Sequence, residues 1–273
     1  MGQFAVRLGI GGVIVSVGAL WAGGAPAQSF TGSGNRMRGM SVGVSAVAAR
    51  PTAAEIVERM LVMNRERLAA LEHYESERTY TVEYTGTGGE HRAELQVRVD
   101  YTGPNQKQLT VVSESGAKFL REKVLRKLVE GEQEAAAASN QMQTTLGPEN
   151  YDAELLDEGV VATPGGRVRA WVLQVTPKVA NKFTYRGKVW VSKDDYAVVR
   201  IQGEPAKNPS WWTNHASFES VYMRRGDVWL PARNVSSSHV RIGGEATLTI
   251  EYGNYPVVTE LPLRPVDEVA ARQ

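Results

Sequence analysis

The chain has 273 residues, of which 42% are hydrophobic and 22% charged, with 31 basic and 30 acidic side chains and no cysteine. This hydrophobic share can fill a core, and the near-balance of charge argues against nucleic acid as the main partner, because phosphate binding needs a concentrated basic surface. The absence of cysteine excludes disulfides, thiolate catalysis, thiolate metal sites and lipidation on cysteine.

The N-terminal segment has the pattern of a secretory signal peptide. A positive start at Arg7 is followed by the uncharged, mostly apolar run Leu8–Ala22 and then by the small residues Ala25–Ala27, which is the order of an export signal. The apolar run is shorter than the ~20 residues that span a bilayer. We therefore favour a cleaved signal peptide over residues 1–27 against a membrane anchor, and predict a soluble periplasmic protein without a lipid anchor.

Composition divides the remaining chain into three predicted parts. Residues 28–50 are rich in glycine, serine and alanine and lack apolar periodicity, which predicts a flexible leader. Residues 51–258 show regular apolar patterns separated by turns and are predicted to form one domain. Residues 259–273 contain two prolines and are predicted to be a flexible C-terminal tail.

The predicted domain opens with an amphipathic helix. Thr52 and Glu55 have the spacing of a capping box, in which each side chain satisfies a free backbone donor of the first turn. The apolar residues that follow recur every three or four positions and predict a helix over Thr52–Leu71 with one stripe facing a sheet. That stripe consists of Ile56, Val57, Met60, Leu61, Leu68 and Leu71.

From Tyr74 onward the apolar period is two, which is typical of antiparallel strands with one buried face. The turn Gly86–Glu90 closes a first hairpin, and a helical insert is predicted over Ala117–Ala138, with an interruption at Gly131. The predicted strands are Thr79–Tyr84, Leu95–Tyr101, Gln108–Val112, Tyr151–Leu156, Val168–Thr176, Phe183–Val191, Tyr196–Gly203, Ala216–Arg224, Val228–Leu230, Arg233–Ile242 and Ala246–Tyr252.

About eleven strands joined by short turns form a meander that is too wide for a flat open sheet. We therefore predict an α+β, mainly antiparallel β fold: a strongly curled, incomplete β-barrel. The two helical segments are predicted to cover its concave face, because the meander supplies no other layer.

Two hairpins resemble those of a known family. Gly187–Ile201 (GKVWVSKDDYAVVRI) combines a strand ending in an aromatic and an aliphatic residue, an acidic turn and an apolar return strand, and Asp227–Pro231 (DVWLP) forms a short hairpin after it. With the order of helices and strands, they resemble the LolA/LolB-like family of outer-membrane lipoprotein-sorting proteins over residues 52–256. The resemblance implies an incomplete barrel, lidded by helices, that binds acyl chains of lipoproteins or related lipids. It assigns no functional residue.

Catalytic patterns are missing from the sequence. The histidines at 73, 91, 215 and 239 have no zinc-site spacing, and neither a nucleophile elbow nor a phosphate-binding loop occurs. The adjacent carboxylates Asp194 and Asp195 suit a tight turn better than acid–base catalysis, because neighbouring turn residues point apart. We expect a protein that is not an enzyme and that needs no cofactor and no metal.

Aromatic residues concentrate in the second half of the predicted domain, on strands that are apolar on both faces. Such strands are covered on both sides, as in a cavity-lining sheet under a lid, although ordinary core filling gives the same pattern. The pair Trp211-Trp212 either packs on the sheet edge or lies at a lipid-facing mouth. The predicted cavity-lining residues are Leu61, Leu68, Trp171, Leu173, Trp190, Val198, Trp212 and Trp229.

These features favour a periplasmic carrier that holds a lipid or lipoprotein acyl chain in an apolar cavity, with a role in lipoprotein sorting. Its expected partners are acyl chains and, potentially, envelope lipoprotein-transfer proteins, with transient membrane contact and no nucleic acid. The alternative is an envelope regulatory or protein-interaction module built on the same fold. A lipid that co-purifies with the protein favours the carrier, whereas a filled core with a protein partner on the outer face favours the module.

Overall fold

The computed structural model describes residues 50–86, 88–103, 106–135, 145–181, 183–207, 213–240, 243–253 and 256–259. The predicted signal peptide, nearly all of the predicted leader and tail, and Trp211-Trp212 lie outside these residues. In the described part of the chain, no helix is both long and apolar enough to cross a membrane.

The first helix, α1 (Ala53–Ala70), begins at the predicted capping box. The backbone N–H of Thr52 donates to Glu55 Oε2 (2.8 Å), and the backbone N–H of Glu55 donates to Thr52 Oγ1 (3.3 Å). The helix ends directly where the first strand begins at Leu71. The predicted helix is confirmed to within a residue at each end, because its start and its apolar stripe are both encoded locally.

The helical insert differs from its prediction in one respect. It consists of α2 (Lys118–Leu120), the π-helical turn η2 (Arg121–Leu125) and α3 (Arg126–Ala135). The predicted interruption at Gly131 is wrong, since α3 runs through this residue and the irregular turn lies earlier. Glycine costs about 1 kcal/mol in a helix interior, which the buried side chains of the insert outweigh.

Among the described residues the strands number eleven, in agreement with the predicted number of about eleven, but several boundaries differ. The predicted strands Val228–Leu230 and Arg233–Ile242 form a single strand, in which Pro231 lies at a register shift where a ladder hydrogen bond is not needed. A short final strand was not predicted. The strands are β1 (Leu71–Gly86), β2 (Gly89–Thr102), β3 (Gln106–Gly116), β4 (Tyr151–Thr163), β5 (Gly166–Pro177), β6 (Tyr185–Ser192), β7 (Val198–Pro205), β8 (Thr213–Arg225), β9 (Val228–Val240), β10 (Gly244–Tyr252) and β11 (Val257–Thr259).

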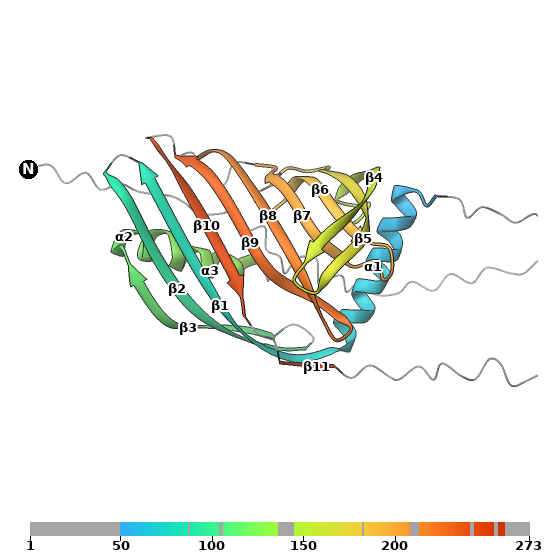
Figure 1. The fold of residues 1–273 in the computed structure, drawn as a ribbon, viewed down its shortest axis with the longest axis horizontal. Coiled ribbons are helices and arrows are strands. Elements are labelled where there is room, and N and C mark those ends of the chain that lie inside the picture. Colours follow the sequence, from blue (N-terminus) through green and yellow to red (C-terminus); the bar gives the residue numbers. More distant parts are fainter. Residues whose placement is uncertain are drawn as a thin grey trace, which may run out of the picture.

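All strands belong to one antiparallel sheet with the order β3-β2-β1-β10-β9-β8-β7-β6-β5-β4, and β11 pairs with the start of β1. The predicted meander is therefore split into β1–β3 and β4–β10, which β1 and β10 join from Arg78↔Tyr252 to Gly86↔Gly244. The edge strands β3 and β4 do not pair with each other, so the curled sheet stays open (Figure 1). This confirms the predicted incomplete barrel.

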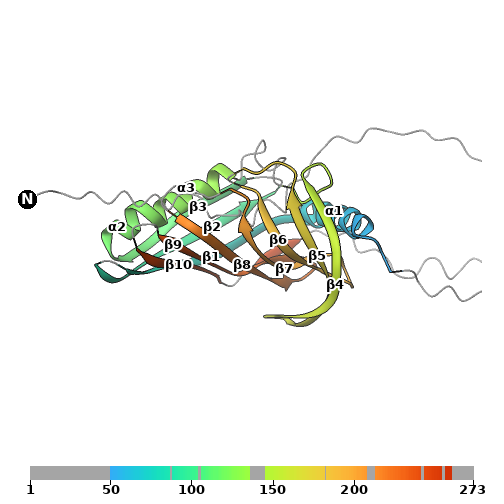
Figure 2. The same ribbon diagram turned by 90° about the horizontal axis from the view of Figure 1, so that it is seen from above.

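Helices α1 and α2–α3 lie on the same side of the curled sheet, at its two ends (Figure 2). Each covers a separate hydrophobic cluster. In the first-helix cluster, α1 packs on β4–β9; in the insert cluster, the helical insert packs on β1, β2 and β10. The helix side chains buried in these clusters are Ile56, Val57 and Met60 in the first, and Leu120, Val124, Leu125, Leu128 and Val129 in the second.

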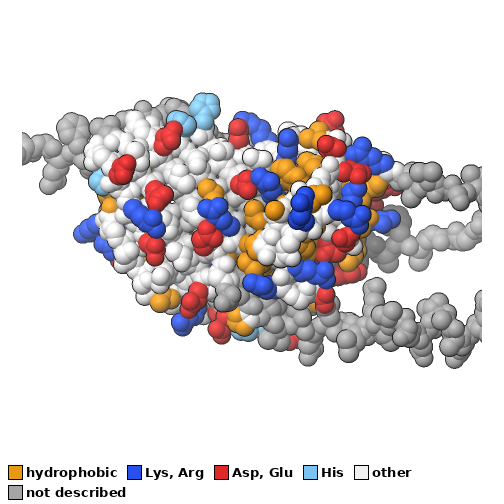
Figure 3. Space-filling model, in the orientation of Figure 1, with side chains coloured by type: hydrophobic (Ala, Val, Ile, Leu, Met, Phe, Trp, Pro, Cys, Tyr) orange, Lys and Arg blue, Asp and Glu red, His pale blue; other side chains and the backbone are white. Residues whose placement is uncertain are grey.

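The outer face of the sheet differs along its length. Apolar side chains gather over the end that carries β4–β8, and basic and acidic side chains are interspersed among them (Figure 3). No single-sign charge dominates the visible face, which agrees with the balanced composition of the sequence.

Candidate functional site

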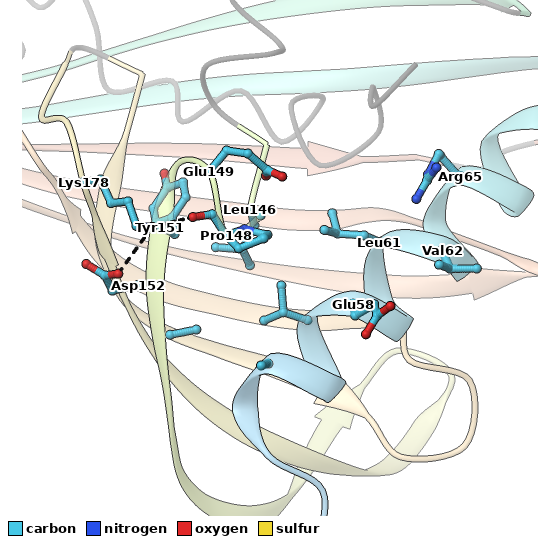
Figure 4. A pocket seen from close by; sticks show the side chains of 14 residues that line it. Glu58, Leu61, Val62, Arg65, Leu146, Pro148, Glu149, Tyr151, Asp152 and Lys178 are labelled. Atoms are coloured by element: carbon cyan, nitrogen blue, oxygen red, sulfur yellow. Dashed lines mark hydrogen bonds and ion pairs between the residues drawn. The ribbon is translucent and has the colours of Figure 1, made fainter. Parts of the chain in front are cut away.

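A groove opens between α1 and the edge of the sheet, with a volume of about 550 Å³ (Figure 4). On α1 its apolar wall includes Val57 and Leu61, and the segment 145–149 brings Leu146 and Pro148 opposite them. Tyr151 and Ala153 at the start of β4 complete the apolar surface. The groove thus lies between the first helix, the segment 145–149 and the start of β4.

The segment 145–149 approaches α1 closely because it contains a glycine. A Cβ atom on Gly147 would lie 3.3 Å from Leu61 Cδ1 and 2.8 Å from Glu149 Oε2. The carbonyl of Gly147 accepts hydrogen bonds from the backbone N–H groups of Asn150 (3.0 Å) and Tyr151 (2.9 Å). This turn fixes where β4 begins and so sets the width of the groove.

Charged side chains surround the apolar wall. Glu58 and Arg65 extend from α1, Glu149 from the opposite segment, Asp152 from β4 and Lys178 from the residue that follows β5 (Figure 4). Lys178 Nζ lies 3.7 Å from Asp152 Oδ1 and donates to the carbonyl of Pro148 (2.5 Å). An apolar floor with a charged rim is suited to an amphiphilic ligand.

The structure separates the eight residues predicted to line a cavity. Leu61 lies in the groove. Trp171, Leu173, Val198 and Trp229 are buried together in the first-helix cluster, and the groove is lined by none of these four. They fill the core between α1 and the sheet, which is the ordinary packing that the sequence left open as an alternative.

Of the other three, Trp190 is partly buried and also packs against the first-helix cluster. Leu68 is half-buried and packs against the insert cluster rather than beside Leu61. Trp190 alternates with the fully buried Val189 and Val191 along β6, and the guanidinium carbon of Arg200 lies 5.0 Å from its ring centroid. Trp212 is outside the described residues. A ligand-lining role for these seven residues therefore stays a prediction.

The groove also contains residues that the sequence analysis did not select. Leu146 is 1% exposed and Tyr151 is 3% exposed; Tyr151 was predicted only as a strand residue, and Leu146 was given no role. The apolar residue Val62, which lies beside the stripe of α1 and is 41% exposed, was the available signal. A valine next to the apolar stripe makes the apolar face of the helix wider than contact with the sheet requires, so part of that face is left for the groove.

The acidic turn Asp194-Asp195, which belongs to the LolA-like hairpin Gly187–Ile201, connects distant segments. Trp229 Nε1 donates to Asp195 Oδ2 (2.7 Å), and the Arg67 guanidinium donates to the Asp195 carbonyl. Asp194 points away and pairs with Arg169 (3.2 Å) on the exposed side. The predicted turn is confirmed, and its second carboxylate holds the end of α1 to the sheet.

Tyr196 follows this turn in a left-handed conformation with φ +56°. Its ring stacks on Trp171 at 5.0 Å between centroids, and Arg59 Nη1 donates to its hydroxyl (3.0 Å). The predicted strand start at Tyr196 is therefore wrong, and β7 begins at Val198, because a residue with positive φ cannot continue a strand. The contacts with Trp171 and Arg59 offset the backbone strain.

A buried ion network holds the helical insert to the sheet. Glu132 of α3 and Arg78 of β1 are 7% and 3% exposed. The Glu132 carboxylate accepts hydrogen bonds from Arg78 Nη1 (2.5 Å) and from the Tyr80 hydroxyl (2.7 Å). The Lys107 ammonium on β3 contacts the same carboxylate. Burial alone would raise the pKa of Glu132, but Arg78 and Lys107 outweigh it and hold the pKa well below its usual range.

One histidine does meet carboxylates. The ligand atoms of His73, Glu75 and Asp100 lie within 4.8 Å of one another on β1 and β2. His73 Nδ1 is 3.7 Å from Asp100 Oδ1, and His73 Nε2 is 3.8 Å from Glu75 Oε1. Exposed acidic groups beside a histidine commonly hold no ion, so the expectation of no metal site stays a prediction.

No family model matches the sequence, and no curated protein matches it. Among solved structures, the chain is similar to a DUF1329 family protein from Desulfovibrio piger, with 14% identity over 77% of this chain and 95% of that chain and a TM-score of 0.37. It is also similar to a LolA superfamily protein from Nitrosomonas europaea, with 10% identity over 78% of this chain and 96% of that chain and a TM-score of 0.32.

A third similar structure is described as an outer membrane lipoprotein-sorting protein domain from Vibrio parahaemolyticus, with 12% identity over 76% of this chain and 95% of that chain and a TM-score of 0.35. Two of these titles name the LolA superfamily or lipoprotein sorting, the family that the hairpins resemble. At these identities and TM-scores, the similarities carry no inference about the family or function of this chain.

Proposed function

We propose that this protein is a periplasmic binding protein that holds the acyl chain of a lipid or lipoprotein in the groove between α1, the segment 145–149 and the start of β4. The observation that carries the proposal is the groove itself, which pairs an apolar wall with an open mouth. Its volume of about 550 Å³ falls within the range of small-molecule sites, ~300–1,000 Å³.

The energetic basis is burial of apolar surface. An acyl chain lying along Val57, Leu61 and Leu146 gains about 25 cal/mol for each Å² removed from water. Val62 at the rim is 41% exposed and would be covered at the same time. If donor and acceptor proteins bury similar areas of the chain, transfer between them is nearly isoenergetic, which suits a carrier in lipoprotein sorting.

The export pattern at residues 1–27 supports a periplasmic location, and the sequence patterns support binding rather than catalysis. We propose residues 51–258 as the functional unit; the last strand of the sheet, β11, extends one residue further, to Thr259. N-terminal sequencing of the exported protein is expected to start at Gln28, and a start at Met1 would reject the cleavage.

The groove is tested by uptake of the fluorescent fatty acid cis-parinaric acid. We expect saturable uptake by the wild type and a loss of about tenfold or more in Leu61→Glu, because a carboxylate on the apolar wall must be buried or must exclude the chain. Val112 is 52% exposed on β3, so Val112→Glu is the matched control and should bind as the wild type does.

Mass spectrometry of the native protein, purified without detergent, should identify a bound lipid. If the wild type shows no saturable uptake and no lipid co-purifies, the carrier proposal fails and the protein-interaction alternative gains support. Thermal melts of both variants check that differences in uptake do not come from unfolding.

A further inference from the structure

The charges around the groove are not all satisfied within the protein. Asp152 and Lys178 pair with each other. Among the described residues, Glu58, Arg65 and Glu149 have neither an ion-pair partner nor a hydrogen-bond partner for their side chains, although all three line the groove. Its mouth therefore presents one unpaired guanidinium and two unpaired carboxylates.

Helix geometry explains why these groups do not neutralise one another. Glu58 and Arg65 are seven residues apart on α1, which places them about 10 Å apart along the helix axis. Leu61 and Val62 occupy the surface between them, and Glu149 faces α1 from the opposite segment (Figure 4). Charges of both signs thus flank the apolar wall without contacting each other.

Resting on the proposed function, we infer that the bound amphiphile carries a zwitterionic head group with a phosphate and a primary ammonium. Arg65 binds the phosphate through its planar fork of donors. Glu149 and Glu58 accept from the ammonium, which has three donors. Phosphoethanolamine has this chemistry.

Other head groups fit the mouth less well. A purely anionic head would pair with Arg65 but would find only carboxylates among the other unpaired charged groups of the mouth. A purely cationic head would pair with the carboxylates and leave Arg65 without a partner. A choline head carries the right charges, but its quaternary nitrogen cannot donate a hydrogen bond to Glu149. Charge complementarity therefore selects the primary ammonium.

The test uses single-chain lysophospholipids with the same acyl chain and different heads, each below its micelle concentration, to displace cis-parinaric acid. We expect the phosphoethanolamine head to bind about 3- to 10-fold more tightly than the phosphoglycerol head, since exposed ion interactions are individually weak. Free phosphoethanolamine without a chain should displace nothing at these concentrations, because the apolar wall supplies most of the affinity.

Charge-removing variants assign the preference to residues. Glu149→Gln should remove most of the preference for phosphoethanolamine over phosphoglycerol, and Arg65→Gln should weaken both heads about 2- to 5-fold. The matched controls are Arg59→Gln and Glu66→Gln, which change exposed residues of α1 outside the groove lining and should leave both affinities unchanged.

The outcomes separate the two proposals. Equal binding of both head groups, with chain uptake retained, overturns the head-group inference and leaves the carrier proposal intact. Tighter binding of the phosphoglycerol head also overturns it. Absence of any chain uptake defeats the carrier proposal and the head-group inference with it.

Discussion

The insert cluster and the first-helix cluster cover the same side of one sheet, but their helices are held by different means. Helix α3 is joined to β1 by a carboxylate buried between Arg78 and Lys107. Helix α1 is joined to the β6–β7 turn by Arg67 and Asp195, where the Asp195 side chain is 21% exposed. Glu132 and Arg78 of the first attachment are buried, whereas the Asp195 carboxylate of the second is partly exposed.

This difference indicates which end of the molecule can change shape. Separating α3 from the sheet would leave the buried Glu132 and Arg78 without partners, whereas the partly exposed Asp195 carboxylate can be hydrated as it separates from Arg67. We therefore expect the insert to stay in place and α1 to move when a ligand enters the groove.

The largest effect is expected from Glu132→Gln. The substitution keeps the side-chain shape but leaves Arg78 and Lys107 buried without a countercharge, which should lower the free energy of unfolding by about 3–5 kcal/mol. Urea denaturation measures it. Glu251→Gln removes one partner of the exposed pair Arg233–Glu251 (2.7 Å) and is the control, with an expected loss of at most about 1 kcal/mol. Equal losses would contradict the buried attachment.

A smaller effect is expected from Asp195→Asn. The change weakens the acceptor for the Trp229 indole and removes the charge facing Arg67, so a loss of about 1–3 kcal/mol is expected. The neighbouring Asp194→Asn affects only the exposed pair with Arg169 and should cost less than about 1 kcal/mol. Thermal melts compare the two. If Asp194→Asn costs as much as Asp195→Asn, the turn does not hold α1.

The smallest effect on the free energy of unfolding is expected from lowering the pH. The pKa of Glu132 is held well below its usual range when folded, so its stabilising contribution is complete above the unfolded pKa of about 4.3 and is lost as the pH falls from there toward the folded pKa. Stability lost through this one group cannot exceed about 1.4 kcal/mol per pH unit. Between pH 5 and 3, urea denaturation should show the wild type and Glu132→Gln converging. Parallel curves would mean that Glu132 is not ionised in the folded protein.

The sequence contains a signal for the buried network of Glu132, Arg78 and Lys107. Glu132 lies three and four residues after Val129 and Leu128, so it shares the buried face of the insert, and Arg78 shares the buried face of β1 with Tyr80. A carboxylate on one predicted apolar face and a guanidinium on another are each unfavourable alone. The two charges can be buried because they form an ion pair with each other. Nothing in the local sequence pattern shows that these two faces pack together.

The candidate site was predicted less well than the fold. Leu61 was selected from the stripe of α1 and lines the groove, but Trp171, Leu173, Val198 and Trp229 were selected for their apolar character and lie in packed core. Hydrophobicity identifies residues that leave water, and it does not distinguish a filled cluster from an open surface. That distinction depends on where the segment 145–149 packs.

The sequence by itself determined the local features of this protein, because each arises from residues close together in the chain. The capping box at Thr52, the alternation along the strands and the acidic turn at Asp194-Asp195 depend on spacings of two to four residues. The tertiary structure alone decided that β1 pairs with β10, from Arg78↔Tyr252 to Gly86↔Gly244. It also decided that Glu132 reaches Arg78 and that Gly147 packs against Leu61. These contacts join segments far apart in the chain, so they depend on which surfaces fit together. The apolar periodicity of a segment does not specify the segment with which it pairs.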